Sequence, residues 1–215
     1  MTPDDLPLYA LIRIRRLLRS WSYCRYLESV TLAGSHAKGT DLRDSDVDIF
    51  LRLSPDTPGT LSAMQASLAN HVLGNIRNVS VRILLEGRFI DLVPARNNTL
   101  WQARFNTWLK TDIPLQIRYV RDSGLIDEIL ALKIWRRRHA LRFPSFLMEL
   151  ATIHARPKDF PSLLHFLATD FPTTRLLDPA NSNNVVSDLL TDVEKLRIAR
   201  TAAVSLGIPF DSTPA

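Results

Sequence analysis

Three aspartates at strand spacing are the residues of this chain best suited to chemistry. Asp46 and Asp48 lie one residue apart in "SDVDIFLRL", and Asp91 lies in "RFIDLVPA". Side chains alternate along a strand, so Asp46 and Asp48 share one face while Val47 and Ile49 point into a core. Two neighbouring carboxylates repel each other, and a cation is needed to offset that repulsion. A hard divalent ion such as Mg²⁺ or Mn²⁺ prefers carboxylate oxygens and would supply it.

The third carboxylate has the same setting as the first two. Asp91 shares a face with Phe89 and Val93, and the residues between them face the core. If this strand pairs beside the strand of Asp46, three carboxylates converge on one patch. Three such groups can hold two divalent ions about 3.5–4 Å apart, an arrangement that supports in-line attack at phosphorus. Taken alone, an acidic pair on a strand also fits a solvated sheet edge.

A glycine-containing turn precedes the aspartate pair. "AGSHAKGT" follows a predicted strand; Gly34 lets the backbone come close to a ligand, and Ser35 offers a hydroxyl and an N–H donor. Such a turn binds phosphate when it opens a helix. His36 lies in the same turn and is a further candidate for phosphate contact.

The elements that must position these side chains follow from hydrophobic periodicity. A helix is expected over residues 4–27, followed by a short strand that ends at Gly34 and by the aspartate strand. A helix over residues 57–76 and a hairpin that turns at Glu86-Gly87 complete this part.

The second part of the chain has a different pattern, which is helical throughout after about residue 121. Its last long helix is expected to end at Gly207. The sequence therefore predicts an α+β fold with a mixed sheet and flanking helices in residues 1–120 and a small helical lobe in residues 121–215.

Taken together, these residues resemble the signature of the DNA-polymerase-β-like nucleotidyltransferases. The matching motif comprises Gly34-Ser35, Gly39-Thr40 and Ser45-Asp46-Val47-Asp48, and Asp91 in "IDLVPA" resembles the third metal carboxylate. The segments "WLKTDIPLQIRYV", "ILALKIWRRRHALRFPSFLMELA" and "LLDPANSNNVVSDL" are similar to later parts of one branch. That branch holds the oligoadenylate synthetases, cyclic GMP–AMP synthase, the bacterial cyclic-oligonucleotide synthases and archaeal-type CCA-adding enzymes. The bacterial cyclic-oligonucleotide synthases are the group that the chain resembles most.

The resemblance implies a polymerase-β-like catalytic palm followed by a helical lobe that closes the nucleotide cleft. It implies that Asp46, Asp48 and Asp91 are the catalytic residues and bind two Mg²⁺ or Mn²⁺ ions per site. It also implies that Gly34 and Ser35 hold the β- and γ-phosphates of a nucleoside triphosphate.

Two residues of the helical half complete the nucleotide site that the resemblance implies. Lys133 in "LALKIW" would reach the triphosphate, and Ser145 in "PSFLMEL" would hydrogen-bond to it. A positive charge and a donor suit a leaving pyrophosphate. The residues leave other interpretations open. Lys133 adjoins "RRR" and fits a solvated basic face, while Ser145, with Pro144 before it and Glu149 downstream, fits a helix N-cap.

Other aromatic and basic residues also have two interpretations. The run "WRRRHALR" fits contact with an acceptor strand or an ordinary charged helix face. Trp101, Trp108 and Tyr119 fit a base-stacking surface or core packing. The histidines other than His36 have no metal-ligand spacing.

The composition is that of an ordinary globular protein, with 46% hydrophobic and 23% charged residues in a chain of 215. Lys+Arg 27 against Asp+Glu 22 gives a net charge of +5, which favours contact with nucleotides or RNA and equally fits a solubility role.

The single cysteine, Cys24, excludes an internal disulfide and is expected in the core. The start "MTPDDLPLY" lacks the basic region of a signal peptide, and no segment is apolar for long enough to span a bilayer. We therefore expect a cytoplasmic protein without a membrane partner.

The expected activity is metal-dependent transfer of a nucleoside monophosphate from a nucleoside triphosphate, ATP in the first place, to a hydroxyl acceptor. Pyrophosphate is released, and the product is a linear or cyclic oligonucleotide. Nucleotide addition to an RNA 3′ end, as in CCA addition, is the alternative, and the chain is short for that group. An alternative of another class is a non-catalytic partner with the same fold, such as an antitoxin.

Overall fold

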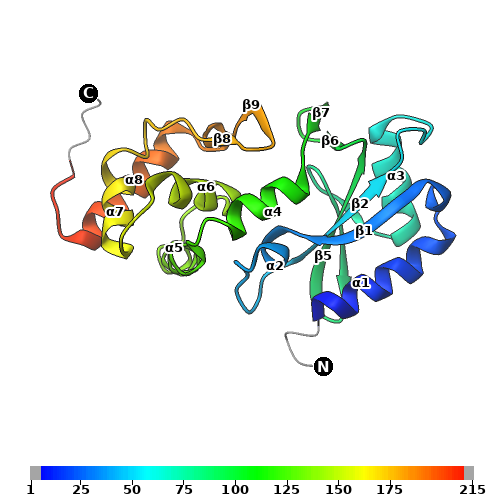
Figure 1. Ribbon diagram of the computed structural model, residues 1–215, viewed down its shortest axis with the longest axis horizontal. Helices are drawn as coiled ribbons and strands as arrows, with labels where there is room; N and C mark the ends of the chain where they lie inside the picture. The colour runs from blue at the N-terminus through cyan, green and yellow to red at the C-terminus, as the bar shows by residue number, and fades with distance from the viewer. Residues whose placement is uncertain (1–5, 211–215) are drawn as a thin grey trace. The chain divides into compact units, whose positions relative to one another are not determined.

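The computed structural model describes residues 6–210, and the chain divides into two compact units, Met1–Ile117 and Arg118–Ala215 (Figure 1). The split falls inside α4 (Ile113–Arg121). The acidic start expected for the first helix, Asp4 and Asp5, lies outside the described residues. The assignment of a catalytic palm to residues 1–120 and of a closing lobe to residues 121–215 stays a prediction.

The first unit is built on a mixed seven-stranded sheet, with strand order β1-β2-β5-β4-β3 and with β6 and β7 continuing from β5. β2 lies between β1, to which it is antiparallel, and β5, to which it is parallel. The strands are β1 (Leu27–Ala33), β2 (Val47–Leu53), β3 (Asn75–Ile76), β4 (Val81–Leu85), β5 (Arg88–Arg96), β6 (Thr99–Gln102) and β7 (Thr107–Lys110).

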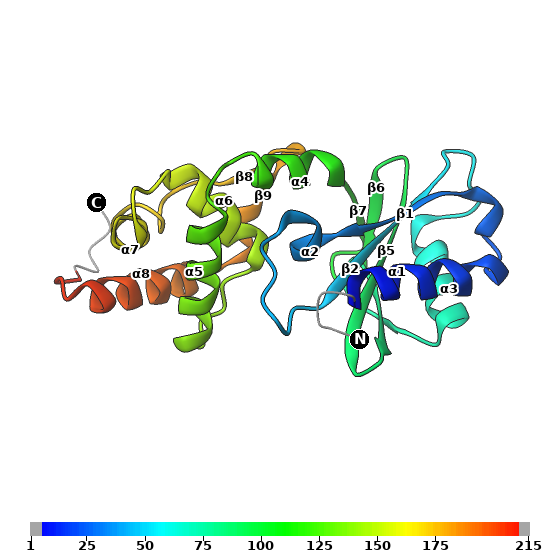
Figure 2. The ribbon, with the colours of Figure 1, turned by 60° about the horizontal axis from the view of Figure 1, so that its bottom comes forward.

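One face of this sheet is covered by two helices, α1 (Leu6–Leu17) and α3 (Leu61–Val72), which Figure 2 shows beside the strands. Alternate residues of β2 and β5, with Val47 and Ile90 among them, are fully buried in the same cluster as residues of both helices. The alternation expected for the two aspartate strands is therefore confirmed, because the residues between the aspartates form the core.

The hairpin expected at Glu86-Gly87 is confirmed. Both residues have positive φ angles, 49° and 75°, and Leu85 pairs with Arg88 across the turn. Such a two-residue turn suits the right-handed twist of the strands that it joins. It sets the register of β4 against β5.

Two expectations for the start of the chain are wrong. The first helix ends at Leu17, and the chain continues through short 3-10 turns at Leu18–Ser20 and Cys24–Tyr26. Trp21 has extended backbone angles and a buried side chain, which interrupts the helix. Cys24 was expected in the core and is exposed, because it lies in the second 3-10 turn instead of on an apolar helix face.

The helix expected over residues 57–76 is α3, which ends at Val72, and the sequence pattern missed strand β3 after it. It also missed β6, β7 and α4, which lie within residues 99–121. β6 folds back on the end of β5, and Leu100 joins Phe50, Ala33 and Ala95 in a small cluster. Phe50, on the same face of β2 as the aspartates, is thus buried.

The second unit has its own core, which gathers apolar residues from four helices. The expected all-helical pattern is wrong in one place, since a two-stranded hairpin of β8 (Leu177–Asp178) and β9 (Asn181–Val185) precedes a 3-10 turn at Val186–Leu189. The helices are α5 (Ile126–Arg138), α6 (Ser145–Ala155), α7 (Phe160–Thr169) and α8 (Asp192–Leu206). The last helix ends with Gly207 at a φ of 67°, as expected.

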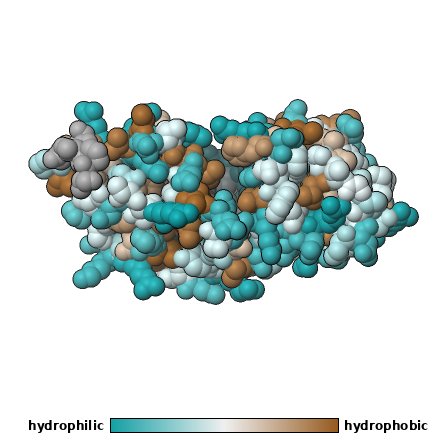
Figure 3. All heavy atoms as spheres, turned by 90° about the horizontal axis from the view of Figure 1, so that it is seen from above, coloured by the Kyte–Doolittle hydropathy of each residue, from teal (hydrophilic) through white to brown (hydrophobic). Residues whose placement is uncertain are grey.

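On the face drawn in Figure 3, patches of hydrophobic residues lie among hydrophilic residues. Within the described part of the chain, no helix is both long enough and apolar enough to cross a membrane.

A buried ion pair joins two helices of the second unit. Lys133 Nζ on α5 donates a hydrogen bond to Glu149 Oε1 on α6 at 3.1 Å, and the two residues are 3% and 1% exposed. Removing one partner of such a pair leaves an uncompensated charge in a poorly solvated place, whereas removing both does not.

We predict that Lys133→Met lowers the free energy of unfolding by about 3–5 kcal/mol, because Glu149 would remain charged and buried. The double variant Lys133→Met/Glu149→Met should recover most of that loss. Lys158, which is exposed in the same unit, is the matched control, and Lys158→Met should change stability by at most about 0.5 kcal/mol. Urea denaturation followed by circular dichroism measures all three, and a single variant as stable as the parent would contradict the prediction.

Candidate active site

The glycine turn and the aspartate pair lie at the same end of two neighbouring strands. β1 ends at Ala33, which pairs with Asp48 of β2, and the chain then enters the short helix α2 (Gly34–Lys38). Ser35 is the second residue of that helix, and its carbonyl accepts hydrogen bonds from the backbone of Gly39 and Thr40. The turn therefore opens a helix, as a phosphate-binding turn must.

The three carboxylates are brought together by strand register. Asp48 pairs with Asp91 across the parallel β2–β5 ladder, and Asp46 lies two residues before Asp48, just ahead of β2. Arg82 of β4 pairs with Asp91 on its other side. Adjacent strands thus carry Asp48, Asp91 and Arg82 in one row.

Arg82 is a residue of the candidate site that sequence reasoning missed. Its Nη2 donates to Asp46 Oδ2 at 2.6 Å and to Asp91 Oδ2 at 2.5 Å, and its Nε donates to Asp91 Oδ1 at 3.1 Å. The guanidinium also lies 4.9 Å from the centre of the Phe89 ring. A signal was available, because a two-residue turn at Glu86-Gly87 by itself places Arg82 opposite Asp91.

The carboxyl of Asp48, which is half-buried, lies among the charges of both other aspartates and of two cations. Burial raises the pKa of Asp48 to about 6, and repulsion from Asp91 and Asp46 acts in the same direction. The positive charges of Lys38 and Arg82 oppose that shift. Lys38, 7% exposed at the end of α2, is a second cation near the site that the sequence pattern did not single out.

Gly34 touches this carboxylate and has no room for a side chain. Its φ is +58°, and a Cβ built on it would overlap the Asp48 carboxylate. Both the backbone conformation and the contact therefore require glycine. His36, two residues further on, lies 3.3 Å from Asp41 through Nδ1, and its buried Nε2 has no hydrogen-bond partner among the described residues.

The three carboxylates suit a divalent metal ion, but the guanidinium of Arg82 lies between two of them. Three carboxylates are hard oxygen ligands, and the structure already gathers positive charge among them. Within residues 6–210, no three His, Cys, Asp or Glu side chains are arranged to hold a metal ion. Arg82 Nη2 lies between carboxylate oxygens of Asp46 and Asp91, so these two would be free to share an ion only after Arg82 moves.

The two expected nucleotide-binding residues of the helical half lie in the second unit. Lys133 is engaged in the ion pair with Glu149. Ser145 is exposed and is the first residue of α6, where Pro144 occupies the N-cap position without a side-chain cap bond. The interpretations of Lys133 as a solvated residue and of Ser145 as an N-cap are therefore wrong, and their contacts with a triphosphate stay predictions.

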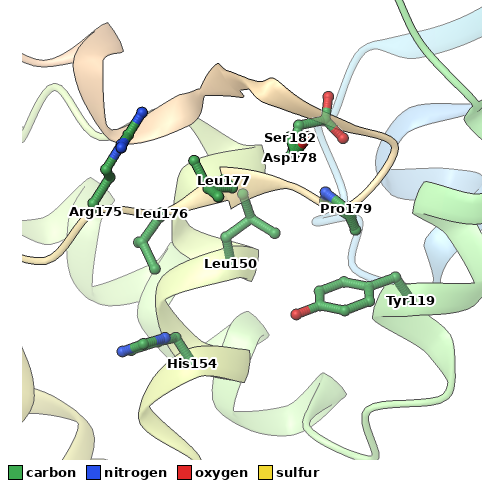
Figure 4. Close-up of a pocket in the computed structure, with 9 residues that line it drawn as sticks. All are labelled: Tyr119, Leu150, His154, Arg175, Leu176, Leu177, Asp178, Pro179 and Ser182. Atoms are coloured by element: carbon green, nitrogen blue, oxygen red, sulfur yellow. The ribbon is translucent and has the colours of Figure 1, made fainter.

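A pocket of about 440 Å³ lies in the second unit between α6 and the β8–β9 hairpin (Figure 4). Tyr119, 41% exposed, and His154 line it from the helices, and Asp178 and Ser182 line it from the hairpin. Asp178 accepts hydrogen bonds from Ala180 N and from the Asn184 side chain. The "DP…NN" stretch thus forms a hairpin whose turn is closed by hydrogen bonds to Asp178. Base stacking on Tyr119 stays a prediction.

The position of Arg82 leads to a prediction about metal binding. Arg82→Gln leaves the three carboxylates without their central cation, so we expect the metal-free protein to lose about 1–3 kcal/mol of stability. The gain in unfolding temperature on adding Mn²⁺ should become larger than in the parent, because no guanidinium has to be displaced.

The matched control is Arg52→Gln, which removes an exposed ion pair between Arg52 of β2 and Glu28. It should leave both the stability and the Mn²⁺ response nearly unchanged. Thermal unfolding with and without Mn²⁺ compares the three proteins. An Mn²⁺ response of Arg82→Gln equal to that of the parent would show that Arg82 does not compete with metal.

The contact of Gly34 with Asp48 leads to another prediction about metal binding. Gly34→Ala must push the Asp48 carboxylate aside, so we expect Mn²⁺ affinity to fall by about 10–100-fold, the usual effect of disturbing a ligand's support. Gly39→Ala is a close control, because Gly39 also has a positive φ, +75°, but nothing lies within 4 Å of its added Cβ. Isothermal titration calorimetry measures both, and equal losses would attribute the effect to backbone strain alone.

The sequence matches the profile of one family and two curated relatives. The sequence profile of a nucleotidyltransferase domain matches residues 12–123, a segment that contains the glycine turn, all three aspartates and Arg82. CCA-adding enzymes of Picrophilus torridus and Thermoplasma volcanium are each 27% identical, over 81% and 92% of this chain. The matches cover 44% and 52% of those enzymes, so the chain spans about half the length of these curated relatives.

Solved structures share the fold. CdnC of E. coli MS115-1 has a TM-score of 0.74 at 20% identity, with 95% of this chain and 84% of that chain covered. The CD-NTase CdnG of Bradyrhizobium diazoefficiens has a TM-score of 0.79 at 10% identity, with 96% and 87% covered. The Cid1 poly(U) polymerase has a TM-score of 0.64 at 12% identity, with 95% and 87% covered. The profile match spans more than half of the chain and includes the three aspartates. This chain therefore belongs to the nucleotidyltransferase domain family.

Proposed function

We propose that this chain transfers a nucleoside monophosphate from a nucleoside triphosphate, with ATP as the first expected donor, to a hydroxyl acceptor. The observation that carries the proposal is the row of Asp48 and Asp91 on adjacent parallel strands, with Asp46 and the Gly34-Ser35 turn at the same end. The profile match supports it, because nucleotidyl transfer is the chemistry of the family.

In the proposed reaction the acceptor hydroxyl oxygen attacks the α-phosphorus of the donor. The bond between the α-phosphorus and the oxygen bridging to the β-phosphorus breaks, and pyrophosphate leaves with that electron pair. The hydroxyl proton passes to a carboxylate oxygen of Asp91, which acts as general base. Ser35 and the backbone of the Gly34 turn hold the β- and γ-phosphates, so that positioning supplies much of the rate.

Asp46, Asp48 and Asp91 are the residues that would hold Mg²⁺ or Mn²⁺, two ions in the proposed site. When bound, the ions would supply positive charge for the phosphates and for the developing oxyanion. Arg82 would have to give up its bonds to Asp46 and Asp91 for the carboxylates to take that role. Burial raises the pKa of Asp48 to about 6, and repulsion from Asp91 and Asp46 adds to the shift. That repulsion supports the proposal, because it favours an added cation.

Two acceptors are supported by different observations. The fold similarity to CD-NTases supports synthesis of a linear or cyclic oligonucleotide, in which a second nucleotide is the acceptor. The sequence similarity to CCA-adding enzymes supports addition to an RNA 3′ end. Both reactions use the same donor chemistry and differ only in what carries the hydroxyl.

The proposal predicts pyrophosphate release when the protein is incubated with nucleoside triphosphates and Mn²⁺, with RNA present in a parallel series as acceptor and activator. Asp46→Ala/Asp48→Ala should reduce the rate by at least about 10²-fold, since bound metal supplies several kcal/mol of barrier lowering. Asp56→Ala, an exposed aspartate outside the site, is the control and should keep the parental rate.

Mass spectrometry of the products separates the two acceptors. Oligonucleotides formed from triphosphates alone indicate the first, and extension of a tRNA that lacks its terminal CCA indicates the second. Absence of product from every mixture, with the parent equal to the double variant, would reject the proposed function.

A further inference from the structure

A second feature of the sheet unit adjoins the carboxylates: an open cavity of about 570 Å³ that Asp91 shares with two arginines. Arg77 and Arg104 line it together with Ser80 and Asn78. Its volume falls within the range of about 300–1,000 Å³ that is typical of small-molecule sites. Ser80 also donates a hydrogen bond to Asp91 Oδ1 at 3.0 Å, so the cavity wall is continuous with the proposed general base.

One rim of the cavity is the connection between β3 and β4, and its backbone is anchored. Arg77 N donates to Ser80 O at 2.8 Å, which closes the turn. The side chain of Gln65, 2% exposed on α3, donates to the carbonyl oxygens of both Arg77 and Ser80 at 3.3 Å. A buried side chain therefore fixes the backbone from which Arg77 projects.

The opposite rim is the connection between β6 and β7, and Asn78 ties the two rims together. Ala103 N donates to Asn78 O at 2.7 Å, and Arg104 N donates to Asn78 Oδ1 at 2.9 Å. Arg77 and Arg104 are far apart in the sequence, and these two bonds bring them to one cavity.

The two guanidinium groups lie open to solvent. Arg77 and Arg104 are both exposed, and within residues 6–210 neither side chain forms an ion pair or a hydrogen bond. Arg104 lies only over the ring of Phe105, 5.4 Å from its centre. Arg82, by contrast, is engaged with two carboxylates. Positive charge at the rim of a cavity, without a protein anion to bind it, suits a phosphate ligand.

The charged residues of the cavity select a ligand that has two chemically different ends. Asp91 has carboxylate oxygens that can accept a further hydrogen bond, from a hydroxyl, while Arg77 and Arg104 attract a phosphate. A nucleotide has both ends, a ribose hydroxyl and a phosphate on its 5′ carbon. A bare nucleoside has only the first.

We propose that this cavity binds the acceptor nucleotide, with its 5′-phosphate on Arg77 and Arg104 and its ribose hydroxyl beside Asp91. The inference rests on the proposed function and assigns the acceptor's place and chemical class. The same phosphate chemistry comes from a free nucleotide or from the last residue of an RNA strand, whose 5′-phosphate is the final internucleotide link.

The test compares the parent with Arg77→Gln/Arg104→Gln by equilibrium binding in EDTA. Calorimetric titrations with AMP and with adenosine form the first arm; AMP has no pyrophosphate to lose and so is not a donor. Anisotropy of a hexa-adenylate RNA labelled at its 5′ end, over a series of KCl concentrations, forms the second. Arg16→Gln is the control, because Arg16 is exposed on α1, on the opposite face of the sheet.

We expect the double variant to bind AMP at least about tenfold more weakly, because neither glutamine can replace a charge-assisted hydrogen bond to the phosphate, and to bind adenosine as the parent does. For the RNA, the slope of log K against log salt should flatten by about 0.7 for each phosphate that the variant no longer neutralises. A response in the AMP arm alone identifies a free nucleotide as acceptor, and a response in the RNA arm alone identifies an RNA end.

The inference is overturned if AMP affinity and the RNA salt slope both match the parent, or if adenosine binding falls as much as AMP binding. Circular dichroism of the double variant checks that it is folded. In turnover, the acceptor KM should rise while the donor KM stays constant. Failure of the proposed function appears separately, as a parent protein that releases no pyrophosphate, and the binding comparison still decides the acceptor site.

Discussion

The mutual repulsion of three carboxylates is the constraint on which the rest of the sheet unit depends. Asp46, Asp48 and Asp91 are held close by backbone register, which cannot relax without breaking the ladders of the sheet. Burial is the main cause that raises the pKa of the Asp48 carboxyl, and repulsion from Asp91 and Asp46 acts in the same direction. Arg82 offsets it with a bidentate contact to Asp91 and one bond to Asp46.

The sheet separates stability from chemistry by using its two faces differently. One face of β2 and β5 packs against α1 and α3 and supplies the main core of the unit. The other face carries the aspartates at one end and the Phe50 cluster further along. Because alternation is strict, no core residue has to be polar for the site to exist, and no aspartate has to lie within the core. Gly34 completes the arrangement by letting the turn approach Asp48 without a side chain.

Four cations within residues 6–210 illustrate three different environments. Lys133 is buried with Glu149 and joins two helices, so its first effect is on stability. Arg82 is bound by the carboxylates of Asp46 and Asp91 and would have to leave them before they could share an ion. Arg77 and Arg104 project from anchored loops into solvent at a cavity. A net charge of +5 does not distinguish these environments, although each implies a different consequence of substitution.

Local patterns in the sequence determined much of this protein. Period-two alternation set the faces of the aspartate strands, and the two-residue turn at Glu86-Gly87 set the pairing of Arg82 with Asp91, although only the structure drew attention to it. The pairing of β2 beside β5, the partner of Lys133, the exposure of Cys24 and the bridge that Asn78 makes were decided by tertiary structure alone. Alternation and turn geometry depend on neighbouring residues, so a sequence displays them directly. Contacts between distant segments depend on which surfaces pack together when the chain closes, and no local pattern encodes that choice.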